Sequence, residues 1–90
     1  MSEVWTFLTN HARVLLQIAR DPQVLMHDVA TEIGISERAV QQIVADLERD
    51  GYITRRRVGR RNTYTVDLSA HFRHPSEASH RVRDLIELFG

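Results

Sequence analysis

The densest charged segment of this sequence is a run of arginines between residues 55 and 61. Residues 51–66 contain five Arg and no acidic residue, although the 90-residue chain as a whole is neutral, with 12 Arg and 12 Asp or Glu. Guanidinium groups form planar, charge-assisted hydrogen bonds with phosphates and carboxylates. The segment therefore predicts an anionic partner, either the phosphate backbone of a nucleic acid or an acidic protein surface.

A second group of candidate binding residues lies just upstream, on a helix that Ser36 is expected to cap and that runs to Asp50, with Gly51 ending it. Four apolar residues recur at helical spacing and should face the core: Val40, Ile43, Val44 and Leu47. The opposite side then presents Glu37, Arg38, Gln41, Gln42 and Ala45. In the DNA major groove, glutamine pairs with adenine, arginine pairs with guanine, and a small alanine allows close approach or contacts a thymine methyl.

The start of this helix offers two further contacts. The Ser36 hydroxyl and the free amides of the first turn can hold a phosphate, because these N–H groups point outward and the helix dipole favours an anion. Glu37 would either repel a phosphate or accept a hydrogen bond from cytosine N4, and the sequence leaves both possibilities open. Because an α-helix fits the major groove, we expect this helix and the arginine segment to bind duplex DNA together.

The elements that position these residues follow from hydrophobic spacing and from turn residues. A first helix buries an apolar stripe that ends at Ala19, before Asp21-Pro22. Its start is open: it either includes Trp5 or begins after a cap at Thr9 or Asn10, which leaves Trp5 and Phe7 on an arm. Residues 24–26 could form a short strand, and residues 27–33 predict a second helix that Gly34 ends.

The arginine segment is predicted to be a β-hairpin. Residues 52–66 are rich in aromatic and β-branched side chains, with a turn near residues 58–62 that Gly59 and Asn62 favour. Strand alternation places Arg55 and Arg57 on one face and Arg56 on the other. Arg60 and Arg61 lie at the predicted tip, and we expect these two to enter a narrow minor groove.

The chain is expected to end in an amphipathic helix that begins after a cap at Ser76. Its apolar stripe exceeds what so small a domain can easily bury, which predicts a homodimer that uses this stripe and the Trp5 arm. The predicted dimer contacts are Trp5, Ala78, Val82, Leu85, Ile86 and Phe89. A dimer would favour a near-palindromic operator whose half-sites lie about 10 bp apart or a near multiple of that spacing.

The order helix, helix, tight turn, helix and arginine-rich hairpin resembles the bacterial winged helix-turn-helix transcriptional regulators of the MarR and ArsR type. The resemblance covers residues 10–67 and depends on Val29, Ala30, Ile33, Gly34, Ile35, Val40 and Ile43, and on the passage from Ala45 to Val66. It implies a mainly helical fold with a hairpin wing, and a DNA-binding regulator, more often a repressor. We therefore expect a winged domain at residues 1–67, a linker at 68–75 and a dimerising helix at 76–90.

Other classes of function have weaker support in the sequence. The chain has no Cys and no P-loop, GxGxxG, HExxH or GxSxG motif, so we expect neither an enzyme nor a bound cofactor. Metal sensing through His71, His74, His80 and Asp84 fits poorly but stays open, as does a winged helix that docks an acidic protein on its arginine hairpin. Double-stranded RNA would be limited to a shape-reading mode. No segment resembles a signal peptide or a membrane span, which favours the cytoplasm.

Overall fold

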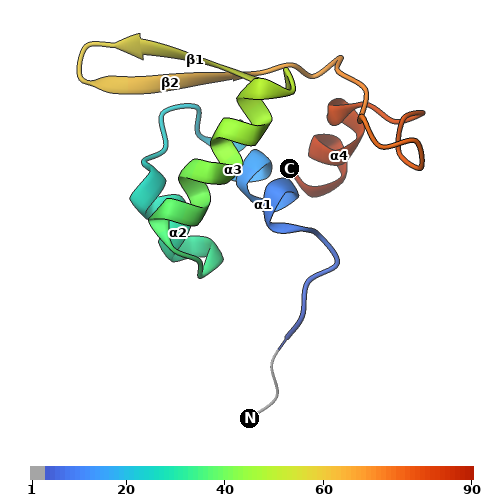
Figure 1. Cartoon of the computed structure of the whole chain (residues 1–90), viewed down its shortest axis with the longest axis horizontal. Helices are drawn as coiled ribbons and strands as arrows, with labels where there is room; N and C mark the ends of the chain where they lie inside the picture. Colours follow the sequence, from blue (N-terminus) through green and yellow to red (C-terminus); the bar gives the residue numbers. More distant parts are fainter. Residues whose placement is uncertain (1–3) are drawn as a thin grey trace.

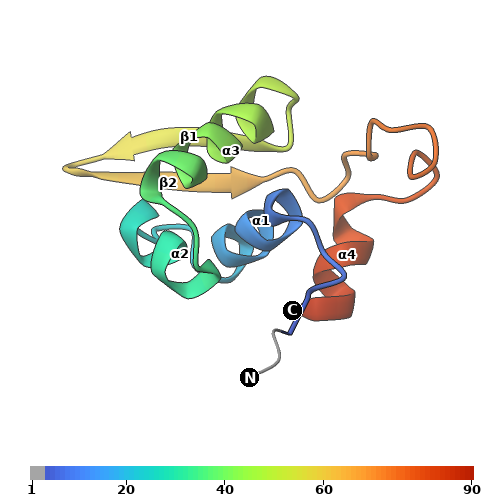
Figure 2. The same ribbon diagram turned by 60° about the horizontal axis from the view of Figure 1, so that its bottom comes forward.

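The computed structural model describes residues 4–90, with four helices and one hairpin in that part of the chain. The elements are α1 (Asn10–Arg20), α2 (Met26–Ile33), α3 (Glu37–Arg49), β1 (Ile53–Val58), β2 (Arg61–Val66) and α4 (Val82–Phe89). The hairpin projects beyond the helices at its turn, and α1 lies between α2 and α4 (Figure 1 and Figure 2). This arrangement confirms the predicted mainly helical, winged helix-turn-helix fold. None of the described helices is long and apolar enough to cross a membrane.

Helix α1 begins at Asn10 because Thr9 caps it. The Thr9 hydroxyl accepts a hydrogen bond from the Ala12 backbone N–H at 3.2 Å. Of the two starts that the sequence leaves open for this helix, the later one is therefore correct. Trp5 and Phe7 lie on an arm that precedes the helix. Their rings meet edge to face with centroids 4.7 Å apart, and both side chains are largely exposed.

The turn between α2 and α3 and both ends of α3 form as the sequence predicts. Gly34 takes a φ of +85°, a left-handed conformation that glycine adopts without strain. The Ser36 hydroxyl caps α3 by accepting a hydrogen bond from the Ala39 N–H at 3.0 Å. Gly51, with a φ of +83°, follows the C-cap at Asp50 and directs the chain into β1.

The short strand predicted at residues 24–26 is wrong. Met26 is the first residue of α2, and residues 24–25 have no regular structure. Instead, the loop between α1 and α2 is joined to β2 by a backbone hydrogen bond, in which the Tyr64 N–H donates to the Pro22 carbonyl at 2.9 Å. Because Pro22 has no N–H to return a second bond, a ladder does not grow from this contact.

The hairpin closes with a two-residue turn of Gly59 and Arg60. Strands β1 and β2 are antiparallel, with Ile53 opposite Val66 at the base and Val58 opposite Arg61 at the tip. Gly59 has a φ of +62°, as such a turn requires. Arg61 and Asn62 lie in β2, so the turn itself holds Arg60 but not Arg61.

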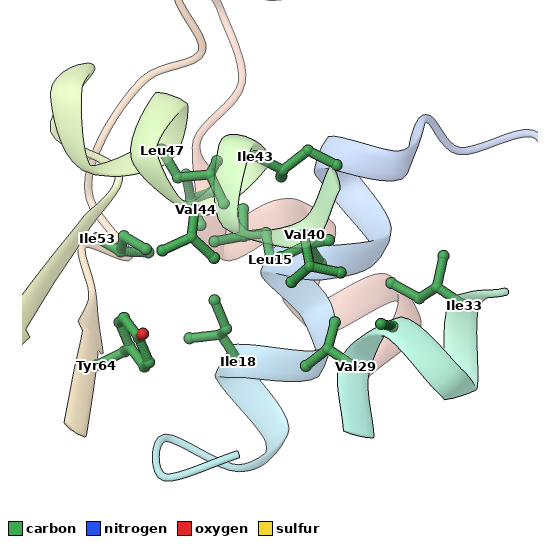
Figure 3. Packing of buried hydrophobic residues seen from close by; sticks show 13 residues of the cluster. Leu15, Ile18, Val29, Ile33, Val40, Ile43, Val44, Leu47, Ile53 and Tyr64 are labelled. Atoms are coloured by element: carbon green, nitrogen blue, oxygen red, sulfur yellow. The ribbon is translucent and has the colours of Figure 1, made fainter. Parts of the chain in front are cut away.

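A single hydrophobic core joins the helices to the base of the hairpin. Figure 3 shows Ile53 and Tyr64 of the hairpin on the same side of the core as Val44 of α3 and Ile18 of α1. All four side chains are buried. Because the hairpin base is packed into this core, its position relative to α3 is fixed by the same contacts that hold the fold together.

Helix α4 begins at Val82 and not after Ser76. The Ser76 hydroxyl pairs with the His74 ring at 2.7 Å, and residues 75–79 form turns. Backbone hydrogen bonds from Phe72 to His80 and from Val82 to Ala70 keep residues 80–82 beside the preceding segment, so the helix starts later. Ala78 consequently lies in an exposed turn and does not belong to the apolar stripe of α4.

The inner face of α4 completes the core of its own chain. Val82 is fully buried, with Leu85 and Ile86 packed against the same cluster. The prediction that Val82 contacts a partner is therefore wrong, because α4 folds back onto α1 and covers this residue. Leu88 and Phe89 remain exposed, at 76% and 44%.

Candidate DNA interface

The outward face of α3, together with its N-cap, carries every residue of this segment that the sequence assigns to DNA contacts. The side chains of this set are all exposed: Ser36, Glu37, Arg38, Gln41, Gln42 and Ala45. The buried residues Val40, Ile43, Val44 and Leu47 hold the opposite face against the core. Although the Ser36 hydroxyl oxygen accepts the capping hydrogen bond, its own proton stays available for a phosphate oxygen.

Glu37, the one acid among these residues, has a neighbour in α2. Its carboxylate lies 3.7 Å from Nδ1 of His27, and both side chains are at least half exposed. Exposed ion pairs contribute little to stability, so this contact does not fix Glu37 in place. The carboxylate is free to turn toward a base or away from a phosphate.

A groove of about 270 Å³ separates α3 from the hairpin. It brings Gln41 and Ala45 of α3 together with Arg55 of β1. The complete lining is Met26, Gln41, Val44, Ala45, Glu48, Arg55, Asn62 and Tyr64. Two of the predicted helix residues and one of the predicted wing arginines therefore share one concave surface.

Arg55 is turned toward α3 by an ion pair. Its Nε lies 3.7 Å from Oε1 of Glu48, and the two side chains are 51% and 28% exposed. The pair is weak at this exposure, so Arg55 can exchange Glu48 for a phosphate at small cost. Sequence reasoning missed Glu48, because the contact joins two elements and no local spacing signals it.

The other wing arginines divide between the two faces of the hairpin. Because cross-strand neighbours share a face, Arg57 lies on the side of Arg55 and Tyr64, whereas Arg56 and Arg61 lie on the other side. Arg57 donates to the Gly59 carbonyl at 3.4 Å, and Arg61 donates to the Gln23 carbonyl at 3.5 Å. Arg60 is exposed in the turn, at the far end of the wing.

Comparison with known proteins agrees with this geometry. The sequence profile of the MarR family matches residues 6–61, which span α1, α2, α3, β1 and the hairpin turn. The chain belongs to the MarR family. Members of this family are DNA-binding transcription regulators and are generally not enzymes. No curated protein sequence matches the chain.

The family match confirms the MarR part of the predicted resemblance, whereas the ArsR part stays a prediction. It ends at Arg61, so most of β2 and all of α4 lie outside the matched region. The parts of the candidate interface that it includes are the outward face of α3 and the arginines of the wing. For this MarR-family chain, the regulator function follows from the family.

Asp46, on the flank of α3 nearest to α1, connects the interface to the rest of this MarR-family fold. Its Oδ2 lies 2.8 Å from Nε2 of His11, while Oδ1 accepts from Nε2 of Gln42 at 3.3 Å and from Arg49 at 3.1 Å. The hydrogen bond with His11, more than the bonds with Gln42 and Arg49, lowers the pKa of Asp46 below its usual value of 3.8. Asp46 is therefore ionised at neutral pH.

The histidines proposed as an alternative metal site have other partners. One ring nitrogen of His71 lies 2.9 Å from the Ala78 carbonyl and the other lies 3.2 Å from Nε of Arg81. His80 lies 3.6 Å from Asp84, and His74 pairs with Ser76. Among residues 4–90, no three His, Asp or Glu side chains are grouped closely enough to hold a metal ion.

Proposed function

We propose that this MarR-family chain is a sequence-specific regulator that binds double-stranded DNA as a homodimer and represses transcription. The observation that supports it most is the groove that places Gln41 and Ala45 of α3 beside Arg55 of the wing. A surface that combines base-reading amides with a phosphate-binding guanidinium suits a duplex, in which base edges and phosphates lie side by side.

In the proposed complex α3 enters the major groove with its outward face toward the bases. Gln41, Gln42 and Arg38 form the direct contacts, and Ala45 allows the helix to approach closely. The Ser36 hydroxyl and the first amides of α3 hold a phosphate at the groove edge. Glu37 then lies near that edge, where it disfavours some registers of the protein on the DNA.

The wing supplies the part of the affinity that does not depend on sequence. Arg55 and Arg57 face the same side as the groove. Arg60 is exposed in the turn, and Arg61, at the start of β2, lies on the other face and can exchange its bond to the Gln23 carbonyl for a phosphate. Each arginine that neutralises a phosphate releases condensed counterions, so affinity should fall steeply as salt rises. Arg60, at the turn, is best placed to enter an adjacent minor groove.

Dimerisation is proposed from the apolar side chains that the protomer leaves uncovered. Trp5, Phe7 and Leu88 are 72%, 89% and 76% exposed, and Phe89 is 44% exposed. Phe7 and Leu88 also line a groove of about 720 Å³, to which the arm, α1, the C-terminal part of α3, the segment before α4 and α4 itself contribute. Exposed apolar surface of this kind is typical of an interface, and a two-fold dimer would present two α3 helices to a near-palindromic operator.

Repression is the simplest consequence of such binding, because a dimer bound over a promoter excludes other proteins from the same DNA. Since the proposed ligand is chromosomal DNA, we expect the protein in the cytoplasm, where bacterial DNA lies. A promoter-reporter assay with the selected operator distinguishes repression from activation. Lower reporter output with the protein present supports repression, and higher output contradicts it.

The experiment that tests the proposed function is selection from a random duplex library, followed by binding at about 50 and 200 mM salt. Enrichment of a near-palindrome, with affinity that falls steeply between the two salt concentrations, supports a dimeric sequence-specific regulator. Enrichment of a single half-site would contradict the proposed dimer but not sequence-specific DNA binding. Absence of binding at low salt would contradict the DNA function and favour the arginine hairpin as a dock for an acidic protein.

A further inference from the structure

The side chain of Gln42 differs from that of Gln41 in having a fixed hydrogen-bond partner within the protein. Nε2 of Gln42 donates to Oδ1 of Asp46 at 3.3 Å, whereas Gln41 faces the groove toward the wing. The spacing of four residues places Asp46 one helical turn beyond Gln42, on the same side of α3. The two glutamines on the base-reading face are therefore not equivalent.

The carboxylate that holds Gln42 is itself held from two directions. His11 of α1 contacts Oδ2 at 2.8 Å, and Arg49 of α3 contacts Oδ1 at 3.1 Å. The Asp46 side chain is 23% exposed, so it is less mobile than a fully solvated carboxylate. Through His11, the orientation of a side chain on the DNA-facing helix depends on a contact with α1.

An ionised carboxylate has acceptors but no donor, and this fixes which end of the Gln42 amide faces it. The NH2 group must point to Asp46, and the amide cannot turn over without placing its oxygen against a negative charge. One N–H is used in this bond, which leaves Oε1 and the second N–H free. An oxygen acceptor and an N–H donor are the pair that glutamine uses on N6 and N7 of adenine.

We propose that Asp46 is a positioning residue that orients the Gln42 amide for adenine and thereby sets the preferred base at one position of each half-site. This inference rests on the proposed function, since it requires α3 to contact bases. Fixing the amide before binding removes an ordering cost that a free glutamine would incur. It also disfavours the flipped amide, whose donor and acceptor are exchanged relative to adenine.

A plainer interpretation is that the Gln42–Asp46 contact only supports the helix, as many pairs four residues apart do. The two interpretations differ for Asp46→Asn, which keeps the size of the side chain but offers both a donor and an acceptor. The substituted amide can hold Gln42 in either orientation, so the helix contact survives while the selection of one orientation is lost. A change in base preference in Asp46→Asn therefore indicates that Asp46 positions Gln42, whereas an unchanged base preference indicates that the contact only supports the helix.

The test measures base preference by library selection for the wild type, Asp46→Asn, Gln42→Ala and the double variant. We expect Asp46→Asn to lower the preference for adenine at one position per half-site by about two- to tenfold, the range expected from ordering one side chain. Affinity for random DNA should stay the same or rise, because a negative charge has been removed near the phosphates. In the Gln42→Ala background, the same change at Asp46 should leave the base profile unaltered.

Glu32→Gln is the matched control for charge. Glu32 is exposed on α2, and its substitution removes one negative charge without touching Gln42 or Asp46. It should shift affinity for all sequences equally and leave base preference unchanged. Thermal unfolding of each variant, monitored by circular dichroism, confirms that the compared proteins are folded at the assay temperature.

Side-chain amide NMR provides a second measurement that needs no DNA. In the wild type, the NH2 signals of Gln42 should be displaced from those of Gln41 and should move toward them in Asp46→Asn. Coincident Gln42 signals in the two proteins would overturn the inference, because they would show that Asp46 does not hold the amide.

The outcomes separate this inference from the proposed function. If the wild type enriches no motif, sequence-specific binding itself fails and the positioning role fails with it. If the wild type enriches a motif but Asp46→Asn keeps the same base preference, the positioning role alone is wrong. A sharper preference in Asp46→Asn would also overturn it, since Asp46 would then withhold Gln42 from the DNA.

Discussion

Removing the wing arginines should change how DNA binding responds to salt, by an amount that follows from their positions. Arg60 lies in the turn and Arg61 begins β2, so both are at the end of the hairpin that extends beyond the helices. If each contacts one phosphate, the double substitution to Ala lowers the slope of log affinity against log salt by about 1.8. Between about 50 and 200 mM salt, the affinity defect of the variant should then shrink by about twelvefold.

Fluorescence anisotropy with a labelled random duplex at four or more salt concentrations measures these slopes. Arg60→Ala alone should change the slope by about 0.9. Arg83→Ala is the matched control, because Arg83 is an exposed arginine on α4, away from the wing. Equal slopes for the wild type and the double variant would refute the assignment of phosphate contacts to the wing tip, as would an equal effect of Arg83→Ala.

Three further predictions follow from the burial and the charges of particular residues. In urea denaturation, Val82→Ala should lower the free energy of unfolding by about 1–3 kcal/mol, because it leaves a cavity in the core. Leu88→Ala should change the free energy of unfolding of the monomer by less than about 0.5 kcal/mol, because Leu88 is exposed. Equal effects of the two substitutions would contradict the assigned faces of α4. The ionised form of Asp46 stabilises the fold above its unfolded pKa of about 3.8, and this contribution is lost as pH falls through the lower folded pKa. In acid unfolding below about pH 5, Asp46→Asn should therefore lose stability less steeply than the wild type. Parallel curves of stability against pH for the two proteins would contradict the contact with His11. Gln41→Ala should weaken discrimination at one base per half-site by about fivefold or more in competition binding, with little change for random DNA; an equal loss on both would argue against a base contact.

Local signals in the sequence were sufficient for the helix-turn-helix and the wing. Ser36 and Gly34 act through their own backbone geometry and neighbouring amides, so their roles are visible without knowledge of the fold. The alternation of β-branched and aromatic residues around Gly59 defines the hairpin for the same reason. The exposed face of α3 follows directly from the spacing of its four buried residues.

Features that depend on contacts between distant segments were not predictable. The pairing of residues 70–72 with residues 80–82 delays the start of α4 and leaves Ala78 in a turn, although the local sequence favours a longer helix. Val82 is apolar in either role, and only the position of α4 against α1 shows that it is buried within the protomer. The contacts of Asp46 with His11 and of Glu48 with Arg55 likewise join separate elements.

The central claim is that α3 and the wing together form the DNA-binding surface. Backbone amide shifts of the labelled protein, titrated with a selected duplex, test it most directly. The largest changes should cluster at residues 36–45 and 55–61, with little change along α4 beyond any effect of dimerisation. Changes confined to the wing would contradict base recognition by α3. Changes centred on α4 and the arm would contradict the central claim, because the DNA would then bind a different face of the molecule.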